Sequence, residues 1–217
     1  MGTWCCRRRC SRSTRVRRSS PSSKRPAVKV ALLGGSFNPP HVGHLMAATY
    51  VHATQGVDAV WLMPSFHHPF GKQLESFEQR VRMCDALCQE TSGWLQTSQV
   101  EREVGGGGRT VDTLAFLVER HPDIQFSLII GSDILRDLPH WKDFDRIQQM
   151  ARVLVLYRAG YPAPNTVGPP LAEVSSTQVR EQLARGMEPS ELVPAGVLKV
   201  AREAGLFGLA IPRVRAE

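Results

Sequence analysis

The sequence lacks any apolar run near the ~18 residues that a membrane-spanning helix needs. Its apolar runs are short, as in Phe126–Ile130, which Ser127 interrupts and which is typical of a buried strand. Cysteine is also scarce, with five in 217 residues. Cys84 and Cys88 are four residues apart, without the tighter spacing and second pair typical of a zinc site. We therefore expect a soluble cytoplasmic protein with reduced thiols and no metal held by its own side chains.

Acidic residues are absent from residues 1–27, which contain nine of the 27 lysines and arginines. Removing nine from 27 leaves 18 basic residues against 20 acidic ones, so the net charge of +7 belongs to this segment and the remainder is near −2. A segment of Arg, Ser, Pro and Cys has too little apolar surface to offset its ordering entropy, which predicts a disordered basic extension. The extension could bind nucleic acid, target the protein, or be an artefact of the start site.

Strand-like and helix-like segments alternate along residues 28–208. Strands are predicted at 28–33, 58–63, 94–98, 125–130 and 152–157, and helices at 41–55, 75–91, 110–120, 176–185 and 194–204. A Pro- and Gly-rich loop is predicted at 158–170, and Arg80 is assigned to the solvated face of its helix. This alternation predicts a single α/β domain with a doubly wound parallel sheet, followed by a short tail at 209–217.

The most informative segment joins the first strand to the first helix, residues 34–45, with the sequence GGSFNPPHVGHL. Two glycines let the backbone approach a ligand closely, and the helix start offers free N–H groups and a positive dipole end to an anion. His41 and His44 are three residues apart, so both rings can share a face, and Gly43 leaves room for a nucleotide. A turn with two surface histidines is the structural alternative, but the whole string predicts a polyphosphate site.

This segment resembles the signature of the nucleotidyltransferases that carry a His-x-Gly-His motif, with Asn38 before the first proline. Over residues 28–208 the chain looks closest to bacterial nicotinate-nucleotide adenylyltransferases, which implies a Rossmann-like nucleotidyltransferase fold. Further matching stretches are RTVDTL at 109–114, FSLIIGSD at 126–133, LPHW at 138–141 and SSTQVR at 175–180.

Each matching stretch also has a structural alternative. Asp133 could cap a helix, and Trp141 could be a core aromatic, although the charged residues after it favour an exposed rim. Ser175 and Gln178 have the spacing of a capping box. Because a capped helix start is itself an anion site, the structural and functional interpretations can both hold at residues 175–180.

The resemblance implies transfer of AMP from ATP to nicotinate mononucleotide in NAD biosynthesis, giving nicotinate adenine dinucleotide and pyrophosphate. The attacking phosphate is already an anion, so catalysis reduces to aligning phosphates and neutralising charge. Mg²⁺ is expected to be held mainly by the ATP phosphates. The implied catalytic residues are His41, His44 and Arg180. Those implied for ATP are Gly34, Gly35, Ser36, Phe37, His41, His44, Gly131, Asp133, Ser175, Ser176 and Arg180, and those implied for the mononucleotide are Asn38, Lys72, Thr110 and Trp141.

Other functions remain open at this point. The amide, nicotinamide mononucleotide, could replace the acid, although Thr110 and the resemblance favour the acid. A pantetheine-phosphate adenylyltransferase is disfavoured because such relatives tend to be shorter and to lack the region of Trp141. A non-catalytic nucleotide sensor is disfavoured by the intact histidines. A nucleic-acid-binding protein would have to act through residues 1–27, because the rest of the chain is nearly neutral.

The loop at residues 66–72 departs from the Pro-Pro-His-Lys run that is frequent in the family. The register of Lys72 and the functions of His67 and His68 therefore stay open, as does the oligomeric state.

Overall fold

The computed structural model describes residues 27–67, 74–105 and 107–209. At its centre is a six-stranded sheet in the order β3-β2-β1-β4-β5-β6, with every neighbouring pair parallel. The strands are β1 (Val28–Gly35), β2 (Ala59–Pro64), β3 (Leu95–Thr97), β4 (Ile124–Gly131), β5 (Ala151–Arg158) and β6 (Val167–Leu171). The predicted doubly wound parallel sheet is confirmed.

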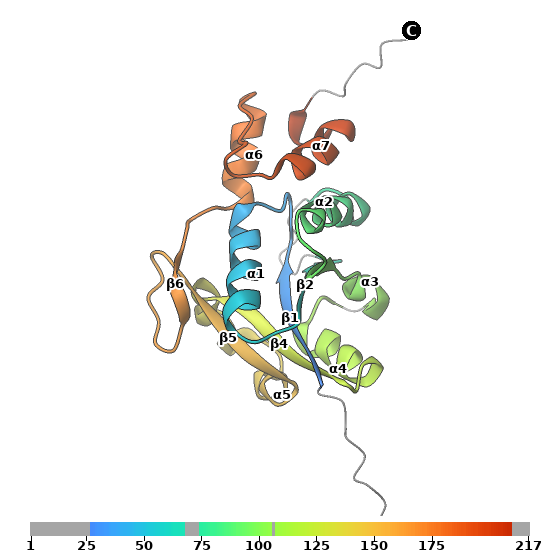
Figure 1. Cartoon of the computed structure of the whole chain (residues 1–217), viewed down its shortest axis with the longest axis vertical. Coiled ribbons are helices and arrows are strands. Elements are labelled where there is room, and N and C mark those ends of the chain that lie inside the picture. Colours follow the sequence, from blue (N-terminus) through green and yellow to red (C-terminus); the bar gives the residue numbers. More distant parts are fainter. Residues whose placement is uncertain (1–26, 68–73, 106, 210–217) are drawn as a thin grey trace, which may run out of the picture.

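Helices cover both faces of this sheet (Figure 1). They are α1 (Val42–Thr54), α2 (Phe77–Gln89), α3 (Val100–Val104), α4 (Thr110–Arg120), α5 (Phe144–Met150), α6 (Ser176–Ala184) and α7 (Ala195–Glu203), with short 3-10 helices at Ser132–Arg136, Leu138–His140 and Leu206–Gly208. Within the described residues, no helix is long and apolar enough to cross a membrane.

Successive residues of β1 point into two different cores. Ala31 and Leu33 belong to the cluster that contains the buried side chains of α1, α2, α6 and α7. Val30 and Leu32 belong to the cluster that contains those of α4 and α5. Because side chains alternate along a strand and both faces of this sheet are covered, the strand is an almost continuous apolar run.

The order of the strands places a crevice beside β1. The chain adds β2 and β3 on one side of β1 and then returns to add β4, β5 and β6 on the other. Such a switch point leaves a crevice beyond the carboxyl ends of the strands. In Figure 1, β1 runs from the bottom of the molecule towards α6 and α7, so the loop that follows β1 lies at their end of the sheet.

Among the strands and α-helices, three elements differ from the sequence predictions. Residues 167–171, predicted as part of a loop, form β6, which pairs irregularly with β5 at the sheet edge. An edge strand tolerates Pro169 and Pro170 because it needs fewer ladder hydrogen bonds. The short helices α3 and α5 were not predicted, since five and seven residues are too few to show a helical period.

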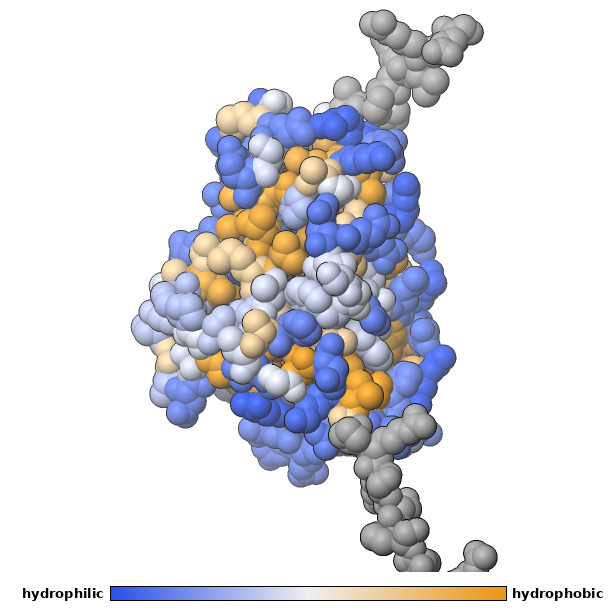
Figure 2. All heavy atoms as spheres, in the orientation of Figure 1, coloured by the Kyte–Doolittle hydropathy of each residue, from blue (hydrophilic) through white to orange (hydrophobic). Residues whose placement is uncertain are grey.

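The surface carries no large apolar face on the side drawn in Figure 2, where hydrophilic side chains surround smaller hydrophobic patches. The large hydrophobic side chains that are exposed lie on separate elements, namely Val28, Met46, Val118, Tyr161 and Met187. The predicted extension and C-terminal tail fall almost wholly outside the described residues, as do Lys72 and His68.

Candidate active site

The loop after β1 is anchored from beneath by Phe37. This side chain is fully buried, and its backbone is left-handed with φ 47°. Its ring closes the space beside Gly35, where a Cβ atom would come within 3.3 Å of the ring. A side chain at position 35 would therefore press on the Phe37 ring, which lies in the core and not among the residues that line the cavity described below.

Hydrogen bonds from α6 and from Glu75, two residues before α2, hold the next residues of the loop. The buried Asn38 accepts a hydrogen bond at Oδ1 from the N–H of Glu75, at 3.2 Å. Its carbonyl accepts one from Arg180 Nη1 at 2.7 Å. The carbonyl of Pro39 accepts one from Ser176 Oγ at 2.8 Å. Segments more than 130 residues apart in the sequence therefore fix this loop together.

Arg80 was assigned to a solvated face, and that assignment is wrong, because only 2% of the residue is exposed. Its guanidinium donates hydrogen bonds to three backbone carbonyls: Glu75 at 3.0 Å, Ser36 at 2.9 Å and Ser65 at 2.8 Å. Helical spacing cannot distinguish this arginine from its exposed neighbours. Its five donors suit several carbonyls at once, so it joins the loops after β1 and β2 to α2.

His41 and His44 lie together where α1 begins. Their ring centroids are 3.8 Å apart, and the N–H of His41 donates to Nδ1 of His44 at 3.2 Å. Burial, with a smaller contribution from the charge of Arg158, lowers the pKa of His41 to about 4. Burial, His41 and Arg158 lower the pKa of His44 well below its ordinary value. Both imidazoles are therefore neutral near pH 7 in the free protein.

Gly43 makes room for a histidine ring. A Cβ atom at this position would lie 3.0 Å from Nδ1 of His41. That Nδ1 atom is buried and, within the described part of the chain, has no hydrogen-bond partner. An unpaired buried nitrogen is costly unless a ligand completes it, so this atom is a candidate contact for a bound group.

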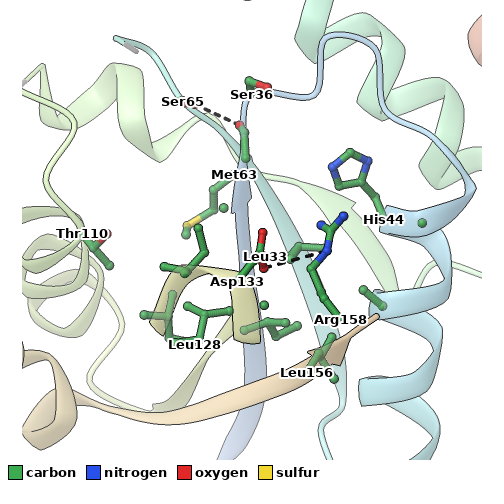
Figure 3. Close-up of a pocket in the computed structure, with 18 of the residues that line it drawn as sticks. Leu33, Ser36, His44, Met63, Ser65, Thr110, Leu128, Asp133, Leu156 and Arg158 are labelled. Carbon is green, nitrogen blue, oxygen red and sulfur yellow. Dashed lines mark hydrogen bonds and ion pairs between the residues drawn. The ribbon is translucent and has the colours of Figure 1, made fainter. Parts of the chain in front are cut away.

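A cavity of about 400 Å³ opens between the ends of β1, β4 and β5 and the start of α1. Figure 3 shows Thr110 on one side of it and His44 with Arg158 on the other, separated by the strand that carries Leu33. We call the two sides the histidine end and the threonine end. The histidine end is formed by His41, His44, Asp133 and Arg158, and the threonine end by Glu101, Gly108, Thr110, Thr113 and Trp141.

An acidic and a basic side chain face each other at the histidine end. Nε of Arg158 lies 3.8 Å from Oδ1 of Asp133, too far for a hydrogen bond, and this buried oxygen has no hydrogen-bond partner among the described residues. The backbone N–H of Arg158 donates to Ser132 Oγ at 2.9 Å, which fixes the end of β5 beside β4. A Cβ atom at Gly131 would collide with Oδ1 of Asp133 and approach Cδ of Arg158 to 2.8 Å, so glycine leaves room for both side chains.

The threonine end contains a carboxyl group. Thr113 Oγ1 donates to Oε1 of Glu101 at 2.8 Å. Burial raises the pKa of Glu101, while this hydrogen bond opposes the rise. Trp141 packs edge-on against Phe144, with ring centroids 6.3 Å apart. It lines this cavity and also an adjoining one of about 480 Å³, and Thr110 is common to both.

The structure gathers most of the predicted site residues. Those that line the cavity are Gly34, Gly35, Ser36, His41, His44, Gly131, Asp133, Thr110 and Trp141. Phe37, Asn38, Ser176 and Arg180 instead belong to the support of the loop after β1. Ser175 caps α6 by accepting a hydrogen bond from the N–H of Gln178 at 3.2 Å, which confirms the predicted capping interaction.

Arg158, Glu101 and Thr113 line the cavity but were not predicted from the sequence. Arg158 had a usable signal, because it is the first charged residue after the apolar run of β5 and the carboxyl ends of the strands form the site. Glu101 lies in the short α3, which had no signal. Within the described ranges, no group of three His, Cys, Asp or Glu side chains could hold a metal ion.

Comparison with known proteins identifies the class. A sequence model described as cytidylyltransferase-like matches residues 32–182. A Myxococcus xanthus protein named "Probable nicotinate-nucleotide adenylyltransferase" is 76% identical over 185 residues, which cover 85% of this chain and 97% of that one. An Anaeromyxobacter protein of the same name is 47% identical over 182 residues, covering 82% of this chain and 96% of its own.

Solved structures share the fold. The nicotinic acid mononucleotide adenylyltransferase of Plasmodium falciparum, complexed with NaAD, matches with a TM-score of 0.71 and 17% identity over 84% of this chain and 98% of that one. Its complex with APC matches with a TM-score of 0.70 and 16% identity, with the same coverage.

The chain belongs to the cytidylyltransferase-like family of nucleotidyltransferases. Within that family, its identity to the Myxococcus and Anaeromyxobacter proteins places it among the bacterial nicotinate-nucleotide adenylyltransferases.

Proposed function

We propose that this chain transfers AMP from ATP to nicotinate mononucleotide, giving nicotinate adenine dinucleotide and pyrophosphate in NAD biosynthesis. The observation that carries the proposal is the single cavity whose histidine end suits phosphates and whose threonine end suits a ring and its substituents. A relative that is 76% identical carries the corresponding name. Two substrates that share one cavity can bring their phosphates together at its centre.

The reaction depends on the alignment of the two substrate phosphates more than on a reactive side chain. An oxygen of the mononucleotide phosphate attacks the α-phosphorus of ATP and forms a new P–O bond. The bond from that phosphorus to the bridging oxygen breaks, and pyrophosphate leaves with the electron pair. Since the nucleophile is already ionised, the protein has to position two phosphates and stabilise the charge that develops on the leaving group.

His41 and His44 are proposed to stabilise the negative charge that develops on the leaving pyrophosphate. Both are neutral in the free protein because of burial and Arg158. A neutral imidazole can still donate one hydrogen bond, and a polyphosphate nearby would raise both pKa values and favour the doubly protonated, cationic form. Arg158 would then turn from Asp133 towards the same anion, since its present contact with that carboxylate is long.

The remaining predicted residues are proposed to act around this pair. Gly34, Gly35 and Ser36 present backbone to the nucleotide, and Gly131 with Asp133 faces the ribose. Ser175, Ser176 and Arg180 would hold the outer phosphates at the start of α6 while supporting the loop. Phe37 and Asn38 would shape the loop, whereas Thr110, Trp141 and Lys72 would contact the mononucleotide.

Mg²⁺ is proposed as the cofactor, bound mainly to ATP phosphates and water. The side chains fit this mode, because the histidine end offers one carboxylate, Asp133. Its Oδ1, which has no hydrogen-bond partner among the described residues, could accept a hydrogen bond from a metal-bound water. When bound, the ion neutralises charge on the leaving pyrophosphate. We propose the cytoplasm as the place of action, where ATP is supplied and the thiols of Cys84 and Cys88 stay free.

Pyrophosphate release tests the function. The full chain with Mg²⁺ and ATP would be supplied in turn with nicotinate mononucleotide, nicotinamide mononucleotide and phosphopantetheine. We expect the highest kcat/KM with the acid mononucleotide and a dinucleotide product of matching mass. A preference for the amide, or for phosphopantetheine, would overturn the proposed substrate.

A further inference from the structure

The two ends of the cavity differ in charge. The histidine end has Arg158 opposite Asp133, together with two imidazoles that can take up protons. The threonine end has the carboxyl group of Glu101, and none of the ion pairs found among the described residues includes it. At the histidine end the charge of Arg158 opposes that of Asp133, and a bound anion would favour protonation of the two imidazoles. The threonine end has a carboxyl group and no cationic side chain among the described residues that form it.

Glu101 is the residue of α3 that turns into the cavity. Its neighbour Arg102 pairs outwards with Glu78 at 3.5 Å, and Glu103 pairs with Arg120 at 2.7 Å. Glu101 instead accepts the hydrogen bond of Thr113, which is 2% exposed. Thr113 lies one helical turn from Thr110 on α4, so the carboxyl group is fixed beside the threonine end.

A half-buried carboxylate without a cation is an unfavourable arrangement for the free protein. Burial raises the pKa of Glu101, and only the Thr113 hydroxyl opposes that rise. Such a group gains most from a ligand that brings a positive charge to it, because the interaction takes place in a region of reduced dielectric constant.

The mononucleotide carries such a charge. When the pyridine nitrogen is bonded to the ribose carbon, the ring becomes a pyridinium with a formal positive charge. We propose that Glu101, held by Thr113, is the counter-charge for this ring and determines specificity for cationic pyridine mononucleotides over neutral-ring ones. This deepens the proposed function and rests on the threonine end being the mononucleotide subsite. Trp141 would add a face for the same cationic ring.

The opposite orientation makes a different prediction. If Glu101 faced the carboxylate of nicotinate instead, the two anions would repel, and the enzyme would disfavour the acid. Removing the charge of Glu101 would then raise kcat/KM for the acid relative to the amide. The sign of the change therefore distinguishes the two arrangements.

The test uses the charge of the ring as its variable. The full chain would be assayed with nicotinate mononucleotide, with its 1,4-dihydro form, whose ring is neutral, and with nicotinamide mononucleotide. The variants are Glu101→Gln, which keeps the shape and can still accept from Thr113, and Glu103→Gln as a matched control. Glu103 loses the same charge two residues away, outside this cavity.

We expect the wild-type protein to prefer the charged ring, and Glu101→Gln to lower kcat/KM for nicotinate and nicotinamide mononucleotides about tenfold, a modest part of what a partly buried charge pair can contribute. The dihydro form and the KM of ATP should hardly change, and Glu103→Gln should resemble the wild type. An equal loss with charged and neutral rings would mean a structural role and overturn the proposal, as would a gain with the acid.

The wild-type comparison keeps the inference testable if Glu101→Gln fails to fold, because equal kcat/KM for the charged and neutral rings would overturn it. Absence of any dinucleotide from nicotinate mononucleotide would instead overturn the proposed function. The two failures are therefore separable.

Discussion

At the scale of single residues, the surroundings of His41 and His44 disfavour protonation, so both rings are neutral until an anion binds beside them. Burial is the main cause that lowers the pKa values of both imidazoles. The charge of Arg158, which faces Asp133 at 3.8 Å, lowers them further. A polyphosphate would reverse this balance. Burial disfavours a cationic imidazole when no anion is nearby, but it strengthens the hydrogen bond that a preorganised imidazole donates to a bound anion.

His44→Ala should lower kcat by about two orders of magnitude or more, the range seen when a preorganised donor to a developing charge is lost. The KM of the mononucleotide should change little, because that substrate is proposed to bind at the other end of the cavity. Steady-state kinetics with each substrate varied would measure both. His52→Ala, on the same helix outside the cavity, is the control, and near-normal turnover in His44→Ala would exclude the proposed function of His44.

The buried His41 should make the free protein less stable in acid. Burial and, to a smaller extent, the charge of Arg158 lower its pKa from 6.5 to about 4 in the folded state, so the folded state binds fewer protons. The stability from keeping it neutral is complete above pH 6.5 and is lost as pH falls towards 4. Between pH 7.5 and 5, this one group should reduce the free energy of unfolding by about 2 kcal/mol.

Urea unfolding of the wild-type and His41→Gln proteins at both pH values checks this expectation. The variant should lose about 2 kcal/mol less between pH 7.5 and 5 than the wild type, whereas His52→Gln should not differ in this way. Equal losses in all three proteins would show that His41 is not the source of the acid sensitivity.

At the scale of elements, the loop of residues 36–40 is held by partners on α2 and α6 as well as by its own buried Phe37. Arg80 binds the carbonyl of Ser36, while Arg180 and Ser176 bind those of Asn38 and Pro39. A loop that presents backbone N–H groups to a phosphate needs its carbonyls to point away from that phosphate and to accept hydrogen bonds from other partners. These side chains meet that need from beneath the loop.

Arg80→Met should lower the free energy of unfolding by about 3 kcal/mol, because it removes the buried guanidinium that donates to three partly buried carbonyls. Chemical unfolding at pH 7.5 would measure the loss. The matched control is Arg82→Met, whose side chain is exposed and bonds to Gln79 at 3.2 Å. A loss below about 1 kcal/mol for Arg80→Met would mean that water or other donors replace the guanidinium.

Element prediction from the sequence succeeded where an apolar period was long enough to be seen. The strands that became β1, β2, β4 and β5 and the longer helices were all predicted within a few residues. The failures have physical causes: α3 and α5 are too short to show a period, and β6 contains two prolines that normally indicate a loop.

At the scale of the whole molecule, charge is divided between the first 27 residues and the rest of the chain. Residues 1–27 contain nine cationic side chains and no acidic one, and β1 begins directly after them at Val28. A chain that begins at Val28 should keep its kcat, its KM values and its melting temperature, since the extension has no apolar spacing for docking. It should also bind polyanions less tightly at low salt.

Side-by-side kinetics and thermal unfolding of the two chains would measure these effects. A large loss of activity, or a melting temperature lower by many degrees, would show that residues 1–27 contribute to the working enzyme and that the proposed domain boundary at residue 28 is misplaced.

The sequence predicted the histidine end of the cavity better than the threonine end. His41, His44 and the glycines of β1 occur in one contiguous string, so their proximity follows from the strand-to-helix junction. Glu101 and Thr113 meet only through the packing of α3 against α4, and Arg158 reaches the site from a distant strand. The contact of Glu101 with Thr113 depends on tertiary structure and leaves no local pattern, whereas the position of Arg158 at the end of an apolar strand was a signal that the sequence did contain.

The arrangement of two substrates along one cavity is tested most directly by a crystal structure of the full chain with nicotinate adenine dinucleotide. We expect the phosphates beside His41, His44 and Arg158, and the pyridinium ring at the threonine end near Trp141 and Glu101. A pyridinium ring found at the histidine end, or a dinucleotide bound outside this cavity, would contradict the arrangement.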